Sequence, residues 1–305
     1  MKWPEELNFM KNSRAKQKTC DTPMDGQLTV ITGATSGVGL SAARVLARAK
    51  SNLVMVCRNK DKALPIKAEL EAEHGITVDI VVADFSRLDD VRNAALFILE
   101  NYPKIDVVIN SVGIHSTRKR YTEDGVELCF MVNHLSIFLF TQMLLSQLIK
   151  QGHGRVIQVN SEGHRFSGVK QKDIHFKRRI YTGLRGYGQS KTAQYLTILE
   201  LDQQLKGTGV TINACHPGAV KTGIGSNNGF LYRLFFKYVT SLFLKDPVIS
   251  GNALYYLAAD PSIAAISGRF FNLTIDELPA KHARDRIMSK KVYDLSMKMV
   301  GLENA

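Results

Sequence analysis

Cysteine is scarce and scattered in this chain of 305 residues, which has four cysteines and no CxxC pair. Because no histidine stands near them at metal-ligand spacing, the sequence predicts free thiols, no disulfide framework and no metal site. We find no apolar run of 18 residues and no apolar core of a secretory signal at the N-terminus. These absences predict a cytoplasmic protein without a membrane-spanning segment.

Positive charge is plentiful, but it is spread along the whole chain and gives a net charge of +12. Only residues 118–120 and 170–179 form basic clusters, and both fall in expected loops. Without interleaved aromatic residues or a nucleic-acid-binding module, a solvated surface is the better interpretation, and we expect no nucleic-acid partner. With 45% hydrophobic residues, the chain has ample material for a buried core.

Short apolar runs alternate with helical patterns from residue 27 onward, after a polar N-terminal extension at 1–26. Strands without polar alternation indicate burial on both faces, and strict alternation with helices indicates βαβ units. The sequence therefore predicts one α/β domain at 27–305 with a doubly wound, mostly parallel sheet, a Rossmann fold. The expected strands are 28–32, 52–57, 77–83, 105–109, 155–159, 210–215 and 268–272, and the expected helices are 38–49, 60–74, 88–100, 127–150 and 187–206.

A glycine-rich turn, TGATSGVG at 32–39, directly follows the first expected strand. Gly33 permits a tight turn, Gly37 lets the backbone approach a pyrophosphate, and Gly39 lets the helix pack close to the strand. The next helix then presents its N-terminal N–H groups to the phosphates. This context predicts a dinucleotide site rather than a simple turn.

The end of the second expected strand indicates which nicotinamide cofactor binds. An NAD site needs an acid there for the ribose hydroxyls, but the chain has Cys57 and Arg58, and the next acid is Asp61. A guanidinium pairs with a 2′-phosphate, and Lys62 is a further cation nearby. We therefore expect NADP(H) to be preferred, with NAD(H) as the alternative, unless Arg58 is simply a solvated loop residue.

Tyr187 and Lys191 form the only YxxxK pattern in the chain. At i and i+4 they share a helix face, and a lysine ammonium favours the phenolate form of a nearby phenol. Tyr187 can then exchange a proton with a substrate oxygen. Ser161 ends the fifth expected strand, where ligands bind in parallel sheets, and its hydroxyl can hold that oxygen. The pair alone is a chance-level pattern, and its position after Ser161 gives it weight.

Taken together, these motifs resemble the short-chain dehydrogenase/reductase family, in the family's order, over essentially residues 27–275. Within the family, the stretches 57–59, 132–135, 187–191 and 216–218 resemble the retinol-dehydrogenase-like branch. The resemblance implies an NAD(P)(H)-dependent enzyme that interconverts a carbonyl and an alcohol. A catalytically silent NADP-binding sensor or scaffold is the alternative, and it is disfavoured because all four catalytic positions are present.

The resemblance also implies roles for single residues. Tyr187 is the acid/base and Lys191 tunes it, while Ser161 stabilises the substrate oxygen. Asn133 organises a water-mediated proton path, and as a buried amide in an apolar helix it needs partners. Asp84 is either an adenine contact or a turn residue. The expected cofactor contacts are Gly33, Thr35, Ser36, Gly37, Val38, Gly39, Arg58, Asp84, Phe85, Asn110, Gly113, Tyr187, Lys191, Pro217, Gly218, Val220 and Thr222.

Two positions depart from the family pattern. Val112 replaces a small alanine in the turn after the fourth strand, which predicts a slightly reshaped cofactor pocket. Asn160 stands where a small hydroxyl residue is usual, and the sequence does not indicate its effect.

An aromatic-rich stretch at 230–244 follows the cofactor loop, where the family places a lid, here at about 225–247. It favours a lipophilic substrate such as a retinoid, steroid, fatty aldehyde or ketone. Arg233 and Lys237 suggest the alternative of peripheral membrane contact, and an ordinary packed amphipathic helix is the third interpretation. The family's long helices, which begin here near Glu127 and Tyr187, imply a homodimer or homotetramer.

Overall fold

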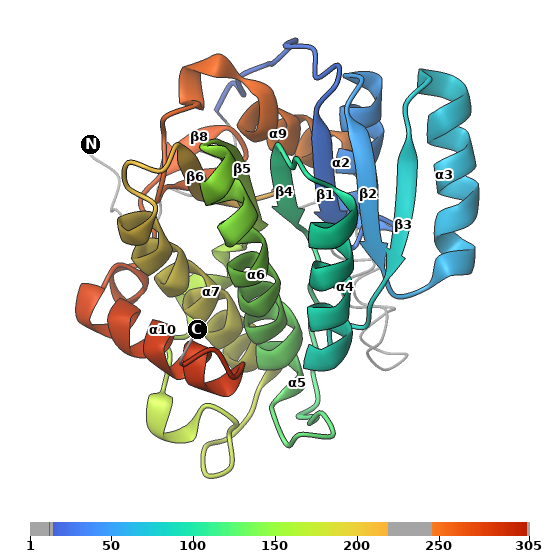
Figure 1. The fold of residues 1–305 in the computed structure, drawn as a ribbon. Helices are drawn as coiled ribbons and strands as arrows, with labels where there is room; N and C mark the ends of the chain where they lie inside the picture. Colours follow the sequence, from blue (N-terminus) through green and yellow to red (C-terminus); the bar gives the residue numbers. More distant parts are fainter. Residues whose placement is uncertain (1–11, 13–14, 219–245, 304–305) are drawn as a thin grey trace.

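The computed structural model describes residues 12, 15–218 and 246–303. Within these residues, eight strands form one sheet in the order β3-β2-β1-β4-β5-β6-β7-β8, with helices on both faces (Figure 1). Neighbouring strands are parallel, except that β7 and β8 are antiparallel. The expected single-domain, doubly wound, mostly parallel sheet is confirmed.

The strands are β1 (Leu28–Thr32), β2 (Asn52–Cys57), β3 (Val78–Val82), β4 (Val107–Asn110), β5 (Gly154–Val159), β6 (Val210–His216), β7 (Phe270–Asn272) and β8 (Ile275–Glu277). The α-helices are α2 (Gly37–Arg48), α3 (Lys60–His74), α4 (Leu88–Asn101), α5 (Leu128–Phe130), α6 (Ser136–Gln151), α7 (Gly183–Gln204), α9 (Val248–Ala259) and α10 (Arg286–Met299). A π-helical turn, η2 (Met131–Leu135), joins α5 to α6. Short 3₁₀ turns are η3 (Glu162–Phe166), η4 (Gln171–Asp173), η6 (Pro261–Ile263) and η7 (Lys281–Ala283).

Two apolar cores lie on the two faces of the sheet. Residues of α4, α6, α7 and α10 build one core, and residues of α2, α3 and α9 build the other. Successive strand residues such as Val30 and Ile31 point into opposite cores, and both are fully buried. This explains the apolar runs without alternation. The carboxyl ends of β1, β2, β4, β5 and β6 share one edge of the sheet, where the loops that follow them gather.

The structure corrects the sequence expectations at several places. Strand β8 and helices α9 and α10 were not predicted, and α7 begins at Gly183, about one turn before Tyr187. The side chain of Thr182 caps this earlier start by accepting a hydrogen bond from the N–H of Arg185. The N-terminal extension was expected to stay outside the core, and this is wrong for Met24, which is fully buried.

The longest apolar helical stretch, Leu128–Gln151, is long and apolar enough to cross a membrane by length and composition. The sequence expectation had found no such segment. Because 83% of its most apolar window is buried inside the fold, the stretch serves here as a core helix between the sheet and its neighbours.

Helix α10 lies across the outer surface of α7 and α6 (Figure 1). Ser289 Oγ donates to the Leu196 carbonyl (2.7 Å), and the Tyr293 hydroxyl donates to Gln204 Oε1 (3.1 Å). Gln142 on α6 donates in turn to the Tyr293 hydroxyl (2.8 Å). The long helices through which the resemblance implies pairing therefore carry α10 on part of their surface. Pairing stays a prediction, and any pair built on α6 and α7 must accommodate α10.

Candidate active site

The glycine-rich turn between β1 and α2 is closed tightly on itself. Gly33 has φ +71° and donates its N–H to the Val56 carbonyl (2.8 Å), and Gly37 has φ +55°. A Cβ built on Gly39 would lie 2.3 Å from the Gly33 carbonyl oxygen. Since backbone cannot give way as a flexible side chain can, only glycine fits at position 39.

The start of α2 offers its N–H groups to a ligand. Within the described part of the chain, the N-cap residue Ser36 makes no side-chain capping hydrogen bond, and the first turn of α2 carries no acid. The orphan N–H groups and the positive end of the helix dipole therefore face no competing carboxylate. This arrangement fits a pyrophosphate, as the sequence predicts.

The turn after β4 is tied to the same loop. Thr32 Oγ1 accepts hydrogen bonds from the N–H groups of Ser111 (3.0 Å) and Val112 (3.3 Å). A Cβ on Gly33 would lie 3.2 Å from Val112 Cγ2, so Val112 packs directly against the glycine-rich turn. Asn110 is fully buried and donates to Thr141 Oγ1 (3.0 Å). Val112, which departs from the family pattern, therefore affects the shape of the glycine-rich turn.

Arg58 and Asp84 follow the ends of β2 and β3. Arg58 is exposed, and the next residue, Asn59, caps α3 by accepting from the Lys62 N–H (2.9 Å). Asp84 Oδ1 accepts from both the N–H and the hydroxyl of Ser86, each at 2.8 Å. Asp84 is thus a turn residue in this structure, and its adenine contact stays a prediction.

Ser161 and Tyr187 meet across Gly163. Ser161 follows β5 and begins η3, where its Oγ accepts from the Gly163 N–H (3.0 Å). A Cβ on Gly163 would lie 2.6 Å from Tyr187 Cε1 and 3.3 Å from Ser161 Oγ. The predicted acid/base and the predicted oxygen-binding hydroxyl therefore flank one small position, which glycine keeps free of a side chain.

Lys191 lies one turn beyond Tyr187 on α7 and is only 2% exposed. Its Nζ donates to the Val159 carbonyl (2.7 Å) and contacts Gln194 Oε1 (3.3 Å). Burial of the ammonium lowers the pKa of Lys191 to about 7. A Cβ on Gly113 would lie 3.9 Å from this Nζ. The turn after β4, where Gly113 is a predicted cofactor contact, therefore adjoins the lysine.

Asn133 lies inside the π-helical turn Met131–Leu135 and is fully buried. Its amide pairs with both backbone groups of Ile114, accepting from the N–H (2.8 Å) and donating to the carbonyl (2.9 Å). Asn133 Nδ2 also donates to Ser190 Oγ on α7 (3.0 Å). The amide has the partners its burial requires, and they join the loop after β4 to the helix of Tyr187. The water-mediated proton path stays a prediction.

Part of the predicted site cannot be placed. Val220, Thr222 and nearly all of the lid at 225–247 lie outside the described residues. Pro217 and Gly218 are described and follow β6. The Pro217 carbonyl accepts from Ser250 Oγ (2.5 Å), and Gly218 has φ +81°.

Comparison with known proteins assigns the family. Residues 27–229 match the family described as short chain dehydrogenase. This chain belongs to that family. Its members are oxidoreductases acting between CH–OH and C=O groups with NAD(P)(H), and the resemblance to the retinol-dehydrogenase branch is confirmed.

Similar proteins include retinol dehydrogenase 13 of Homo sapiens, which is 32% identical over 91% of this chain and 86% of its own length. Retinol dehydrogenase 14 of Homo sapiens is 34% identical over 92% of this chain and 88% of its own length. A crystal structure of an uncharacterized Mycobacterium Paratuberculosis protein matches with TM-score 0.75 and 26% identity, covering 95% of this chain and all of the other.

In this short-chain dehydrogenase, Asn160 links the elements that carry the predicted catalytic residues. Asn160 Nδ2 donates to the Lys191 carbonyl (3.0 Å) and to Gln194 Oε1 (2.8 Å), while Oδ1 accepts from the Ser161 N–H (2.7 Å). One buried amide therefore joins the serine turn to the helix that carries the lysine. This is the effect that the sequence left open for Asn160, and Gln194 was not predicted at all.

Two histidines near the site were also missed. His164 is fully buried, and its Nε2 accepts from the Ala280 N–H (3.1 Å), so its Nδ1–H donates to the Ser161 carbonyl (2.8 Å). Burial lowers the pKa of His164 to about 3, which keeps this bridge neutral. The ring of His115 lies edge-on to Tyr187 at a centroid distance of 5.4 Å. The contacts of His164 with Ala280 and of His115 with Tyr187 have no motif, because the partners are distant in sequence.

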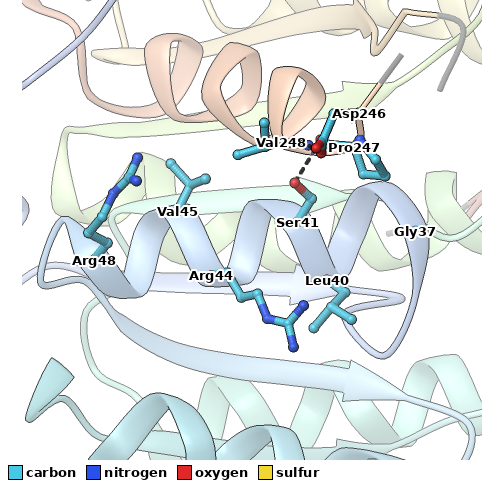
Figure 2. Close-up of a pocket in the computed structure, with 9 residues that line it drawn as sticks. All are labelled: Gly37, Leu40, Ser41, Arg44, Val45, Arg48, Asp246, Pro247 and Val248. Carbon is cyan, nitrogen blue, oxygen red and sulfur yellow. Dashed lines mark hydrogen bonds between the residues drawn. The ribbon is translucent and has the colours of Figure 1, made fainter. Parts of the chain in front are cut away.

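A cavity of about 400 Å³ lies on the outer face of α2, against the start of α9 (Figure 2). It contains Gly37 of the cofactor turn but no predicted catalytic residue. Ser41 Oγ donates there to the Pro247 carbonyl (2.7 Å), and Arg44 is paired with Glu69 (2.8 Å). The cavity is therefore separate from the Tyr187 site, and we assign it no ligand.

Proposed function

We propose that this enzyme uses NADP(H) to interconvert a carbonyl and an alcohol on a lipophilic substrate, with Tyr187 as general acid/base. The observation that carries the proposal is the convergence at Gly163. Tyr187 and Ser161 flank this glycine, and the buried Lys191 lies one turn further along α7. A substrate oxygen placed between the phenol and the serine hydroxyl would meet two hydrogen-bonding groups at once.

The protein's part in the chemistry is to move a proton at the substrate oxygen. A nearby ammonium favours the phenolate form of a tyrosine, and Lys191 with a pKa of about 7 changes its charge near neutral pH. Ser161 Oγ, held by the Gly163 N–H, orients the oxygen toward Tyr187. Asn160 fixes Ser161 relative to α7, and Asn133 ties α7 to the loop after β4.

The chain's own residues fit a nicotinamide dinucleotide. Gly39 leaves no space for a side chain, and the first turn of α2 has neither an acid nor a side-chain cap among the described residues. These groups would hold the pyrophosphate, and Arg58 would pair with a 2′-phosphate. When bound, the nicotinamide supplies or accepts the hydride.

The lipophilic substrate is supported by two features. The similar human proteins are named retinol dehydrogenases, and the stretch at 230–244 is rich in aromatic residues. We propose a cytoplasmic enzyme with peripheral membrane contact, which suits a substrate that partitions into lipid.

The direct test of this function is a panel of lipophilic aldehydes and ketones, retinal included, incubated with NADPH and followed by cofactor absorbance. We expect oxidation of NADPH with at least one member of the panel. If the protein binds NADPH but turns over no carbonyl and, with NADP⁺, no alcohol, the silent sensor or scaffold would replace the enzyme.

Cofactor choice is tested separately with Arg58→Asp. Because a carboxylate repels the 2′-phosphate and accepts from ribose hydroxyls, we expect the ratio of kcat/KM for NADPH over NADH to fall by at least about tenfold. Lys150→Asp, an exposed change on α6, serves as the matched control. An unchanged ratio for Arg58→Asp would show that Arg58 does not contact the 2′-phosphate.

A further inference from the structure

Two basic clusters that are far apart in the sequence lie side by side in the fold. Lys119 Nζ donates to the Phe176 carbonyl (3.0 Å), and the Tyr121 hydroxyl donates to the His175 carbonyl (3.1 Å). In Figure 1 the two loops project together from the lower end of the molecule, beyond α5 and the start of α7. We call residues 118–121 and 166–185 the basic face.

The basic face is strongly cationic. Residues 166–185 contain six lysines and arginines and a single acid, Asp173. Asp173 is engaged locally, since its carboxylate accepts from the backbone N–H groups of Lys177 (2.7 Å) and Arg179 (2.9 Å) and pairs with the Arg179 guanidinium. On the neighbouring loop, Glu123 pairs with Arg87 (3.3 Å), and Asp124 is exposed. The exposed cations of the face are Arg118, Lys119, Arg120, Lys170, Lys172, Lys177, Arg178 and Arg185.

Large apolar side chains protrude among these cations. Phe166 is 64% exposed, Ile180 is 77% exposed and Leu184 is 57% exposed. Single exposed apolar residues are normal on protein surfaces. Three exposed apolar side chains within one cationic segment are instead typical of a surface that binds lipid.

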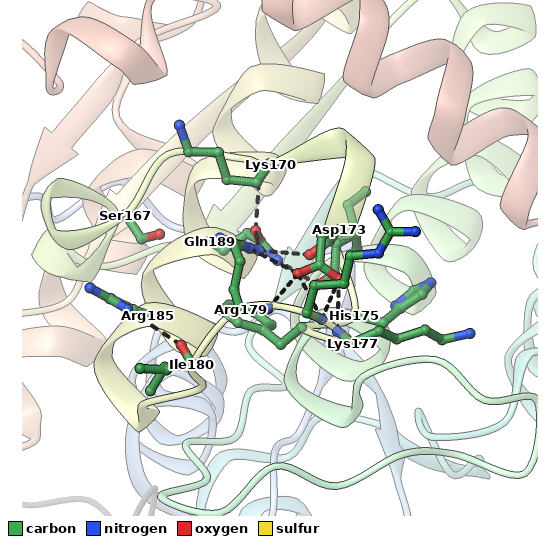
Figure 3. A network of polar contacts seen from close by, with 12 residues as sticks. Ser167, Lys170, Asp173, His175, Lys177, Arg179, Ile180, Arg185 and Gln189 are labelled. Atoms are coloured by element: carbon green, nitrogen blue, oxygen red, sulfur yellow. Dashed lines mark hydrogen bonds and ion pairs between the residues drawn. The ribbon is translucent and has the colours of Figure 1, made fainter.

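The fold holds this segment in place. Arg179 donates to the Asp173 carbonyl (2.7 Å) and to Gln189 Oε1 (2.8 Å), and its guanidinium lies 4.2 Å from the centre of the Phe176 ring. Gln189 also donates to the Ile174 carbonyl (2.8 Å). Figure 3 shows these contacts between the loop and α7, with Ile180 just beyond them. The exposed side chains are therefore presented by a fixed backbone.

We propose that the basic face docks on an anionic phospholipid membrane, with Ile180 and Leu184 entering the headgroup region and the cations pairing with lipid phosphates and carboxylates. Charge complementarity selects an anionic surface. The protruding aliphatic side chains select a bilayer over a nucleic acid, which gives them no apolar layer to enter. The docking step is independent of the catalytic proposal.

The basic face also adjoins the catalytic helix. Leu184 and Tyr187 both lie on the first turns of α7, and a Cβ on Gly183 would lie 2.9 Å from the His115 ring, which contacts Tyr187. Docking would bring the entrance of the Tyr187 site near the lipid. Binding to the bilayer deepens the peripheral membrane contact of the proposed function and does not need its catalytic part, whereas delivery of a lipophilic substrate from the bilayer rests on the proposed catalytic activity.

The experiment is co-sedimentation of the full chain with vesicles of phosphatidylcholine alone or with about 30% phosphatidylserine. We expect binding to the anionic vesicles at least about tenfold stronger than to neutral ones, and its loss at about 0.5 M NaCl. Lys177→Glu/Arg178→Glu and, separately, Ile180→Ser/Leu184→Ser should each weaken binding by at least about fivefold.

Control variants make changes of the same kind elsewhere on the surface. Lys150→Glu/Lys206→Glu reverses two exposed charges, and Phe97→Ser removes a side chain that is 47% exposed on α4. Both should bind vesicles like the unchanged protein, and circular dichroism checks that every variant is folded. Vesicle binding that persists in both face variants, or that the controls lose equally, overturns the proposal. So does binding in which only the charge reversal has an effect, because that describes attraction to any polyanion.

Discussion

Replacing Asn160 by alanine removes the amide that joins the Ser161 turn to helix α7. Asn160 is 2% exposed, and its three hydrogen bonds reach Ser161, Lys191 and Gln194. Each buried partner left unsatisfied costs about 1–3 kcal/mol, although the Lys191 carbonyl and Gln194 Oε1 keep other neighbours. We therefore expect the free energy of unfolding to fall by about 2–4 kcal/mol.

The assay is urea unfolding followed by circular dichroism, together with kcat for the best carbonyl substrate. Because the Ser161 turn and α7 lose their link, kcat should fall by about 10- to 100-fold. Asn101→Ala is the matched control, since the Asn101 amide donates to the Phe97 carbonyl (2.8 Å) at the exposed end of α4. It should change stability by less than about 0.5 kcal/mol. If Asn160→Ala lies within the same limit, the linking role is refuted.

Two further predictions concern the cofactor turn and acid stability. Gly39→Ala places a Cβ 2.3 Å from the Gly33 carbonyl oxygen, so NADPH affinity by fluorescence titration should fall at least about tenfold. The control Gly207→Ala strains a backbone with φ +79° but meets no atom within 4 Å, so it should lower stability and leave NADPH affinity unchanged. Burial lowers the pKa of both His134 and His164 to about 3, so the unfolded chain binds more protons between pH 6.5 and 3, and stability should drop as pH falls through that window. His164→Gln should reduce this dependence by up to about 1.4 kcal/mol per pH unit, measured by urea unfolding at pH 7 and pH 5. An unaltered slope would mean that His164 binds its proton in the folded protein at the same pH as in the unfolded chain.

The local parts of the fold could be predicted from the sequence. Strand β2 and helix α3 have the expected bounds because Asn59 caps the helix start and Gly75, with φ +64°, ends it. Helix α9 was missed because its sequence VISGNALYYLAA is apolar almost all round and shows no helical period. Strand β7 lies within the expected strand 268–272, whereas β8 was missed because its three residues are too few for a clear pattern.

The candidate site also has parts that the sequence predicts and parts that it does not. The grouping of Ser161, Tyr187 and Lys191 near one position could be predicted because spacing and order mark these residues, and their roles stay predictions. The Asn133 amide pairs with Ile114, 19 residues earlier, and no local pattern encodes that contact. The His164 bridge needs Ala280, 116 residues away. Such groups act through tertiary contacts, which a single sequence does not display.

The central claim is that Tyr187 exchanges the proton with the substrate oxygen, and Tyr187→Phe tests it most directly. The change removes only the phenolic hydroxyl and keeps the ring that packs on Gly163 and His115. We expect kcat to fall by about 10²- to 10⁴-fold, with NADPH affinity by fluorescence titration and the unfolding midpoint unchanged. A variant that keeps its turnover with the same carbonyl substrate would contradict the assignment.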